Sequence, residues 1–198
     1  MSSGMHESWT HKLARRAVRP LVATAVTPNH LTTARFITGL LACGAFAWGP
    51  SAGLWAGIWW FISAFLDRAD GELARLSGKT SPGGHRYDYI TDVIINSLAF
   101  ITIGLGLSRA THSVWPTVLG VLAGSTIAGA AILSEQLERS GKIEGKAYEG
   151  AGGFDFDDIL YVLTPIAWLG WTYPLLIGAA IGGPAFFVLT WRQLRAVD

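Results

Sequence analysis

Long apolar segments dominate this chain and limit the folds open to it. Hydrophobic residues make up 51% of its 198 residues and charged residues only 15%, and the mean hydropathy is +0.37. In lipid, backbone polar groups must be hydrogen-bonded within the protein, and a helix of about 20 apolar residues achieves this while crossing the bilayer. We therefore expect an all-α, polytopic membrane protein. Six candidate membrane-spanning helices are visible, at residues 31–49, 53–77, 86–107, 114–137, 157–172 and 174–192.

The basic residues predict how these spans are oriented. If the N-terminus is cytoplasmic and six helices follow, the cytoplasmic side collects every Lys and Arg except Arg109, which is 14 of the 15. Cytoplasmic loops of membrane proteins carry an excess of Lys and Arg. Both termini are therefore expected in the cytoplasm. The net charge of +1, without a basic stripe, gives no indication of nucleic-acid binding.

The chain is expected to divide into an N-terminal juxtamembrane segment, residues 1–26, and one transmembrane domain, residues 27–198. Within residues 7–26, four basic side chains alternate with apolar ones. This pattern is typical of an interfacial amphipathic helix lying on an anionic leaflet. Two roles fit such a helix equally well: a brace that helps to close the mouth of an active site, or a simple membrane anchor.

Four aspartates stand out against this apolar background: Asp67, Asp70, Asp88 and Asp92. An ionised carboxylate near the bilayer core costs about 2.5–3.5 kcal/mol on insertion scales, so it needs a partner. On helices, Asp67 and Asp70 share one face, and so do Asp88 and Asp92. Two facing pairs would form an oxygen-only cage, which suits Mg²⁺, Mn²⁺ or Ca²⁺ rather than Zn²⁺. The alternative, a solvated acidic loop, leaves the small and basic residues between the pairs unexplained.

Two sequence motifs resemble those of one enzyme family. The order D-x2-D-G-x2-A-R-x8-G-x3-D-x3-D over residues 67–92 resembles the signature of the CDP-alcohol phosphatidyltransferases, an integral-membrane family, and all eight positions match. The stretch Thr27-Pro28-Asn29-His30-Leu31-Thr32, followed by Arg35, is similar to the TPN-x-LT-x-x-R stretch that opens the first span in many members. The resemblance covers most of residues 27–107. It implies a phosphotransferase that moves a phosphate-linked group from a CDP-activated alcohol to a second alcohol and releases CMP.

The resemblance also implies roles for the aspartates. Asp67, Asp70 and Asp88 would be metal ligands. Asp92 would be the catalytic general base and a further ligand of the second ion. The expected cofactor is Mg²⁺ or Mn²⁺, with two ions per active site.

The substrate-binding residues that the two motifs imply are Thr27, Pro28, Asn29, Gly71, Ala74, Arg75, Ser81 and Gly84. Gly71 and Ala74 would leave room beside the carboxylates for a nucleotide. Arg75 would contact a phosphate, although the acidic neighbour Glu72 is an alternative partner. The residues at 27 and 29 have an alternative as ordinary helix caps.

Acidic residues mark the expected acceptor side. The fourth span ends with Arg139, and the fifth begins near Asp155, Asp157 and Asp158. Relatives with phosphorylated acceptors typically carry arginines or lysines at these two places. Three carboxylates would repel an acceptor phosphate. We therefore expect a neutral or cationic alcohol, such as an amino alcohol or a polyol.

Two features of this acceptor side have alternatives. The three aspartates are also typical of acidic caps at a helix N-terminus. Tyr161, Trp168 and Trp171 would attract a cationic acceptor if their rings faced it. Aromatic residues near membrane interfaces more commonly form a belt at the headgroup level.

The leading hypothesis is a phosphatidyltransferase for phospholipid synthesis, which transfers a phosphatidyl group from CDP-diacylglycerol to a small, non-phosphorylated alcohol. The chain is short, as in bacterial members with this donor, so a bacterial inner membrane and a cytoplasmic active site are expected. One alternative is that a soluble CDP-alcohol of the choline or ethanolamine type donates to a lipid hydroxyl. An alternative of another class is a divalent cation transporter, but the aspartates cluster at one membrane face. The resemblance also suggests a homodimer surrounded by membrane lipids.

Overall fold

The computed structural model describes residues 9–139 and 159–197, and these ranges contain helices and no β-strand. The predicted all-α fold is confirmed over this part of the chain. The elements are α1 (Trp9–Val18), η1 (Arg19–Leu21), α2 (Pro28–Trp48), η2 (Pro50–Ala52), α3 (Gly53–Ser77), α4 (Pro82–Thr111), α5 (Trp115–Arg139), α6 (Ile159–Trp168) and α7 (Thr172–Val197).

Four helices of the described ranges are long and apolar enough to cross a membrane: α2, α4, α5 and α7. The chain is thus an integral membrane protein, as predicted, although this finding covers four of the six expected spans. Helix α3 has 25 residues, but its second half carries the acidic and basic residues of the first motif. Of the fifth expected span, residues 157–172, the structure describes helix α6, which has ten residues.

Proline and capping residues fix where the helices begin. Helix α2 starts at Pro28, three residues before the predicted boundary, because proline at the first helical position has a backbone angle suited to a helix. The backbone N–H of Thr27 donates to His30 Nδ1 at 3.2 Å. At the start of α4, Ser81 accepts a hydrogen bond from Gly84 N at 3.0 Å. Helix α3 ends at Gly78, whose φ of +67° is a left-handed conformation that glycine adopts freely.

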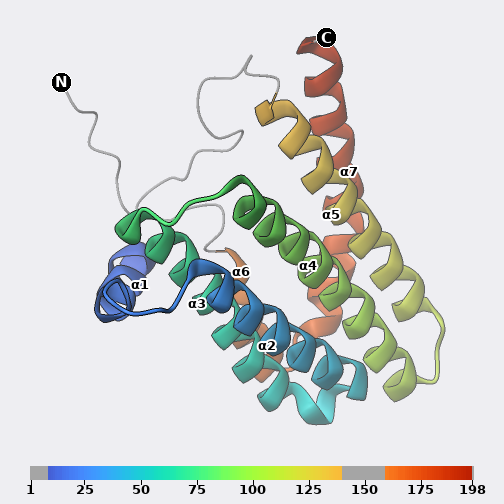
Figure 1. Ribbon diagram of the computed structural model, residues 1–198. Coiled ribbons are helices and arrows are strands. Elements are labelled where there is room, and N and C mark those ends of the chain that lie inside the picture. The colour runs from blue at the N-terminus through green and yellow to red at the C-terminus, as the bar shows by residue number, and fades with distance from the viewer. Residues whose placement is uncertain (1–8, 140–158, 198) are drawn as a thin grey trace.

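The helices pack around an apolar core. Helix α2 lies against α3 and α4, α4 against α5, and α5 against α7, while α1 and α6 both pack on α3 (Figure 1). Small residues allow these close approaches: a Cβ added at Gly106 of α4 would collide with the backbone oxygen of Phe46 of α2. Close packing also occurs at Gly39 of α2, where an added Cβ would lie 2.8 Å from Ile95 of α4. By contrast, Gly44 has nothing within 4 Å of such a Cβ.

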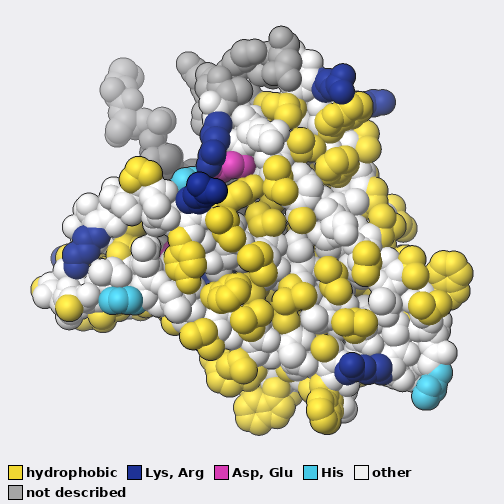
Figure 2. All heavy atoms as spheres, turned by 45° about the vertical axis from the view of Figure 1, so that its right-hand side comes forward, with side chains coloured by type: hydrophobic (Ala, Val, Ile, Leu, Met, Phe, Trp, Pro, Cys, Tyr) yellow, Lys and Arg dark blue, Asp and Glu magenta, His cyan; other side chains and the backbone are white. Residues whose placement is uncertain are grey.

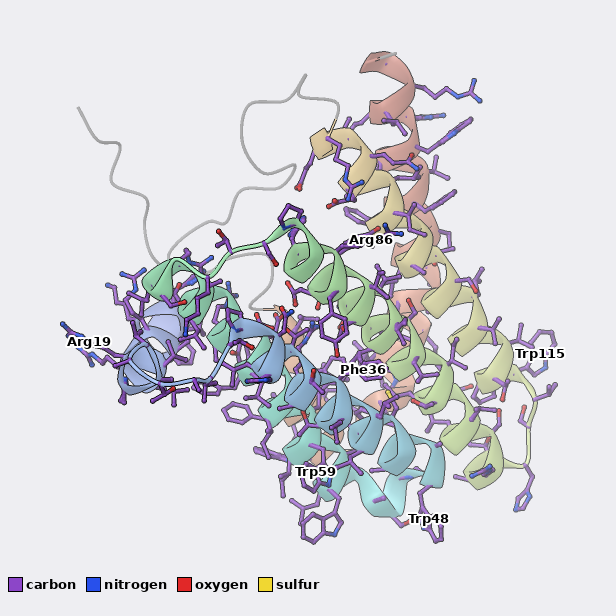
Figure 3. All side chains as sticks on the ribbon, in the orientation of Figure 1. Arg19, Phe36, Trp48, Trp59, Arg86 and Trp115 are labelled. Atoms are coloured by element: carbon purple, nitrogen blue, oxygen red, sulfur yellow. The ribbon has the colours of Figure 1, made fainter. Side chains whose placement is uncertain are left out.

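The two ends of the bundle differ in side-chain type. Trp48, Trp59 and Trp115 lie at the end where α2 joins α3 and α4 joins α5, whereas Arg86 lies toward the opposite end (Figure 3). Trp48 is 75% exposed and Trp115 67%. Hydrophobic side chains cover the flank of the bundle, and Lys and Arg gather toward its edges (Figure 2). This distribution is typical of a protein whose flank faces lipid tails and whose tryptophans lie at an interface.

Candidate functional site

The candidate site forms where α3, α4 and α2 meet. Helix α3 contributes Asp67 and Asp70, and α4 contributes Asp88 and Asp92. Carboxylate oxygens of Asp67, Asp70 and Asp88 lie within 4.8 Å of one another. Asp92 lies outside that group of three, but its Oδ1 contacts the guanidinium of Arg35, which also faces Asp67 and Asp88. The structure thus brings the four predicted aspartates to one place.

The donor set fits a hard divalent cation. All candidate ligand atoms are carboxylate oxygens, which suit Mg²⁺ or Mn²⁺. Asp88 Oδ1 and Asp92 Oδ1 are buried and accept no hydrogen bond within the described ranges. Buried oxygens without a directed hydrogen bond are rare in folded proteins, so a further bound partner is the ordinary explanation. A metal ion bound between these carboxylates would be such a partner.

Helix α2 supplies two buried polar side chains to the aspartate cluster. Thr32 Oγ1 donates to Asp70 Oδ2 at 2.6 Å, and both residues are buried. One turn further on, Arg35 is only 2% exposed, and its Nη1 lies 3.2 Å from Asp67 Oδ1 and 3.5 Å from Asp88 Oδ1. Both residues belong to the second motif, but neither has an individual role predicted from the sequence. Their i,i+3 spacing was the available signal, because it places both on one face of the first span.

Five of the predicted substrate-binding residues lie at the N-termini of two helices. Thr27, Pro28 and Asn29 begin α2, and Ser81 and Gly84 begin α4. A Cβ added at Gly84 would lie 3.0 Å from both Asn29 Oδ1 and Ser81 Oγ. The N-termini of α2 and α4 therefore meet, and their helix dipoles favour a bound anion.

On α3, Gly71 and Ala74 are both half-buried, one and four residues beyond Asp70. A Cβ added at Gly71 would lie 3.5 Å from the guanidinium of Arg75. That guanidinium is exposed and pairs with Glu72, with Arg75 Nη2 2.5 Å from Glu72 Oε1. The structure thus shows Arg75 paired with its alternative partner, Glu72.

Glu72 attaches the N-terminal helix to this part of α3. Its carboxylate is 1% exposed, lies 2.7 Å from His11 Nδ1 and accepts a hydrogen bond from Arg15 Nε at 2.9 Å. Thr10, Ala14 and Val18 form the buried face of α1. Trp9 and Leu13 stay about half exposed, at 56% and 48%. Helix α1 thus presents one face to the protein and an apolar edge outward, as an interfacial helix would.

The acceptor-side residues are described in part. Arg139, at the end of α5, donates from Nε to Glu135 Oε1 at 2.7 Å. Glu135 Oε1 also lies 3.7 Å from His85 Nε2 in the first turn of α4. Arg139 is therefore held near the end of the bundle that carries the α4 N-terminus. The acidic run Asp155, Asp157 and Asp158 lies outside the described residues.

Trp168 lies at the end of α3 remote from the aspartates, which fits the alternative of an aromatic belt better than contact with an acceptor. Its indole Nε1 donates to Leu54 O at 3.2 Å, at the start of α3. Leu54 precedes Asp67 by 13 residues, which is about 20 Å along a helix. Trp171 lies in the turn that follows α6, at the same distant end. Tyr161 lies closer to the aspartates, since its hydroxyl donates to Ala64 O at 3.1 Å.

Comparison with known proteins agrees with this geometry. A family model described as CDP-alcohol phosphatidyltransferase matches residues 25–190, a range that contains both motifs. An archaetidylinositol phosphate synthase of Pyrococcus horikoshii is 33% identical over 128 residues. That alignment covers 65% of this chain and 65% of the relative, so the chain spans just under two thirds of the relative's length.

Proposed function

The chain belongs to the CDP-alcohol phosphatidyltransferase family, and on that premise we propose that it transfers a phosphatidyl group from CDP-diacylglycerol to the hydroxyl of a small alcohol and releases CMP. One observation carries the proposal. Oxygens of Asp67, Asp70 and Asp88 lie within 4.8 Å of one another, and Thr32 and Arg35 of the other motif contact them.

The proposed cofactor is Mg²⁺ or Mn²⁺, with two ions held by Asp67, Asp70, Asp88 and Asp92. Such ions, when bound, neutralise the charge of the donor pyrophosphate and of the departing CMP. Bound ions would explain why four carboxylates lie together when, among the described residues, one arginine, Arg35, pairs with them.

The chain's own groups would bind the donor and remove a proton. The N-termini of α2 and α4 would receive the pyrophosphate, since they meet at Asn29 and Gly84 and the positive ends of both helix dipoles lie there. Asp92 would accept the proton of the acceptor hydroxyl. The new bond then forms between the acceptor oxygen and the phosphatidyl phosphorus, while the bond from that phosphorus to CMP breaks.

The acceptor has two candidates. The acidic run 155–158 favours the non-phosphorylated alcohol predicted from the sequence, because these carboxylates would repel a phosphate. The name of the Pyrococcus relative favours a phosphorylated inositol, since that protein makes an archaetidylinositol phosphate. For such an acceptor, Arg139 is one candidate cation, because its partner Glu135 also contacts His85 near the α4 N-terminus.

The test is CMP release by the purified protein in detergent. CDP-diacylglycerol and Mn²⁺ or Mg²⁺ are supplied with amino alcohols, inositol or inositol phosphate, and the lipid product is identified by mass spectrometry. We expect CMP release with one acceptor class, loss of activity with EDTA, and a fall in the rate of about 10²–10⁴-fold for Asp92→Asn.

Two other outcomes would support the alternatives. CMP release from CDP-choline or CDP-ethanolamine with diacylglycerol, but not from CDP-diacylglycerol, would support a lipid acceptor in place of a lipid donor. Cation flux into liposomes without CMP release would support a transporter.

The remaining proposals concern membrane topology, location and oligomeric state. We propose six spans, cytoplasmic termini and a cytoplasmic active site in a bacterial inner membrane, and a homodimer. The placement of Trp48 and Trp115 opposite Arg86 supports the orientation (Figure 3). The matched family range begins at residue 25, close to the proposed boundary between residues 1–26 and 27–198.

A further inference from the structure

Arg35 occupies an unusual place for a buried arginine. It comes from α2, is 2% exposed, and directs one nitrogen, Nη1, at carboxylates from two other helices. That nitrogen lies 3.2 Å from Asp67 Oδ1 and 3.5 Å from Asp88 Oδ1, and it contacts Asp92 Oδ1. A single cationic group thus faces three of the four aspartates.

The contacts of Arg35 differ from those of an ordinary structural ion pair. Arg35 Nε and Nη1 make no well-directed hydrogen bond within the described ranges, and neither do Asp88 Oδ1 and Asp92 Oδ1. Strong arginine–carboxylate pairs are usually hydrogen-bonded and often bidentate. Glu72 shows the ordinary kind, because it accepts directed hydrogen bonds from both Arg15 and Arg75. Arg35 is therefore held in the cluster by charge, and its one positive charge is outnumbered by four carboxylates.

We propose that Arg35 is an internal counterion of the aspartate cluster and competes with divalent ions for it. Before ions bind, its charge reduces the repulsion between the four carboxylates and keeps α2, α3 and α4 together. When ions bind, the guanidinium gives up part of its contact with Asp92. Arg35 is thus a positioning residue that lowers metal affinity while stabilising the metal-free protein. The inference rests on the proposed metal site.

Electrostatics gives this role a distinctive consequence. A fixed positive charge beside a dication disfavours ion binding, whereas the same charge stabilises unpaired carboxylates. Removing the charge should therefore change the two properties in opposite directions. A residue with a merely structural role would lose metal affinity and stability together, because the ligands would no longer be held in place.

The experiment compares Arg35→Gln, Arg35→Lys and the wild type, with Arg109→Gln as the matched control. Arg109 carries the same charge, but it lies near the other end of α4 and donates to Ala47 O at 2.8 Å. Free Mn²⁺ is measured by electron paramagnetic resonance during titration. Thermal unfolding in detergent is followed in EDTA and in saturating Mn²⁺.

We expect Arg35→Gln to bind Mn²⁺ on the order of tenfold more tightly, a factor within the usual range of coupling between sites. Its Tm should fall in EDTA, and saturating Mn²⁺ should remove most of that deficit. Arg35→Lys should stay close to the wild type in both measurements, because it keeps the charge. Arg109→Gln should leave the Mn²⁺ affinity unchanged.

Weaker Mn²⁺ binding by Arg35→Gln, or an equal loss of Tm with and without Mn²⁺, would overturn the counterion role. If Arg35→Gln does not fold, Arg35→Lys decides, because a lysine variant that binds Mn²⁺ markedly less tightly than the wild type is incompatible with the proposal. The proposed function fails separately, since a wild type that binds no Mn²⁺ and releases no CMP has no metal site for Arg35 to regulate.

Discussion

Asp70 shows how much of the site depends on a single hydrogen bond between helices. Thr32 Oγ1 donates to Asp70 Oδ2 at 2.6 Å, and the two residues are 2% and 4% exposed. Thr32→Val keeps the shape of the side chain but leaves that carboxylate oxygen without its donor. Loss of one partner of a buried hydrogen bond costs about 1–3 kcal/mol. We therefore expect a lower Tm in detergent and weaker Mn²⁺ binding.

The matched control for this prediction is Thr38→Val on the same helix. The Thr38 hydroxyl donates to the carbonyl oxygens of Ala34 and Arg35, within α2. Its loss should leave Mn²⁺ binding unchanged. Equal effects of the two substitutions on Mn²⁺ binding would show that Asp70 does not need the Thr32 donor.

The aspartates were predictable from the sequence because their spacings are local. Asp67 and Asp70 share a helix face at i,i+3, and so do Asp88 and Asp92 at i,i+4, so each pair follows from helix geometry. The position of Arg35 was not predictable in this way, because it depends on which face of α2 packs against α3 and α4. The same reason applies to Trp168, whose partner Leu54 lies on another helix.

Helix α1 is joined to the candidate site through Glu72, and this contact offers a way to separate its two possible roles. The buried carboxylate lies among His11, Arg15 and Arg75. Glu72→Gln would leave these groups without their counter-charge, and removing one partner of a buried ion pair costs about 3–5 kcal/mol. We expect faster hydrogen–deuterium exchange in residues 9–18. Lys12→Ala, an exposed change on the same helix, should leave exchange nearly unaltered.

The rate of CMP release in detergent then distinguishes whether α1 is a brace or only an anchor. If α1 is a brace, Glu72→Gln should lower CMP release in detergent, where no bilayer is needed for anchoring. If α1 is only an anchor, release in detergent should stay at the wild-type value. Unchanged exchange in residues 9–18 would contradict the attachment itself.

The contact between α2 and α4 depends on glycine at one crossing point. A Cβ at Gly106 would collide with Phe46 O and lie 2.9 Å from Gly49 Cα, both of them backbone atoms. Gly106→Ala should therefore push the helices apart and lower the Tm, with a cost of about 1–3 kcal/mol, as for other overpacked sites. Gly44→Ala is the matched control, since nothing lies within 4 Å of its added Cβ. It should leave the Tm unchanged or raise it slightly, because alanine favours helix more than glycine does.

The boundaries of the first four predicted spans agree with the observed helices to within four residues. The predicted range 53–77 coincides with α3, α5 spans 115–139 against the predicted 114–137, and α4 extends the predicted range 86–107 by four residues at each end. The extensions come from polar ends, such as Ser81 and Gly84 before the apolar part of α4, which hydropathy does not include. The fifth span remains a prediction, because part of its range lies outside the described residues.

The distribution of charge and tryptophan over the molecule predicts its orientation in the membrane. Arg109, the one basic residue expected outside, donates to Ala47 O beside Trp48, at the end where α4 turns into α5. A cysteine at Val114, which is 66% exposed, should then face the outside, and one at Thr80 should face the cytoplasm. The single native cysteine, Cys43, is buried and gives a low background.

Intact spheroplasts treated with a membrane-impermeant maleimide should therefore label Val114→Cys and spare Thr80→Cys. Permeabilised cells should label both variants, which controls for the reactivity of the two sites. Because the aspartate cluster lies in the same half of the bundle as Thr80, this result would also place the proposed active site on the side where CDP-linked donors are made. Labelling of Thr80→Cys alone in intact spheroplasts would reverse the orientation.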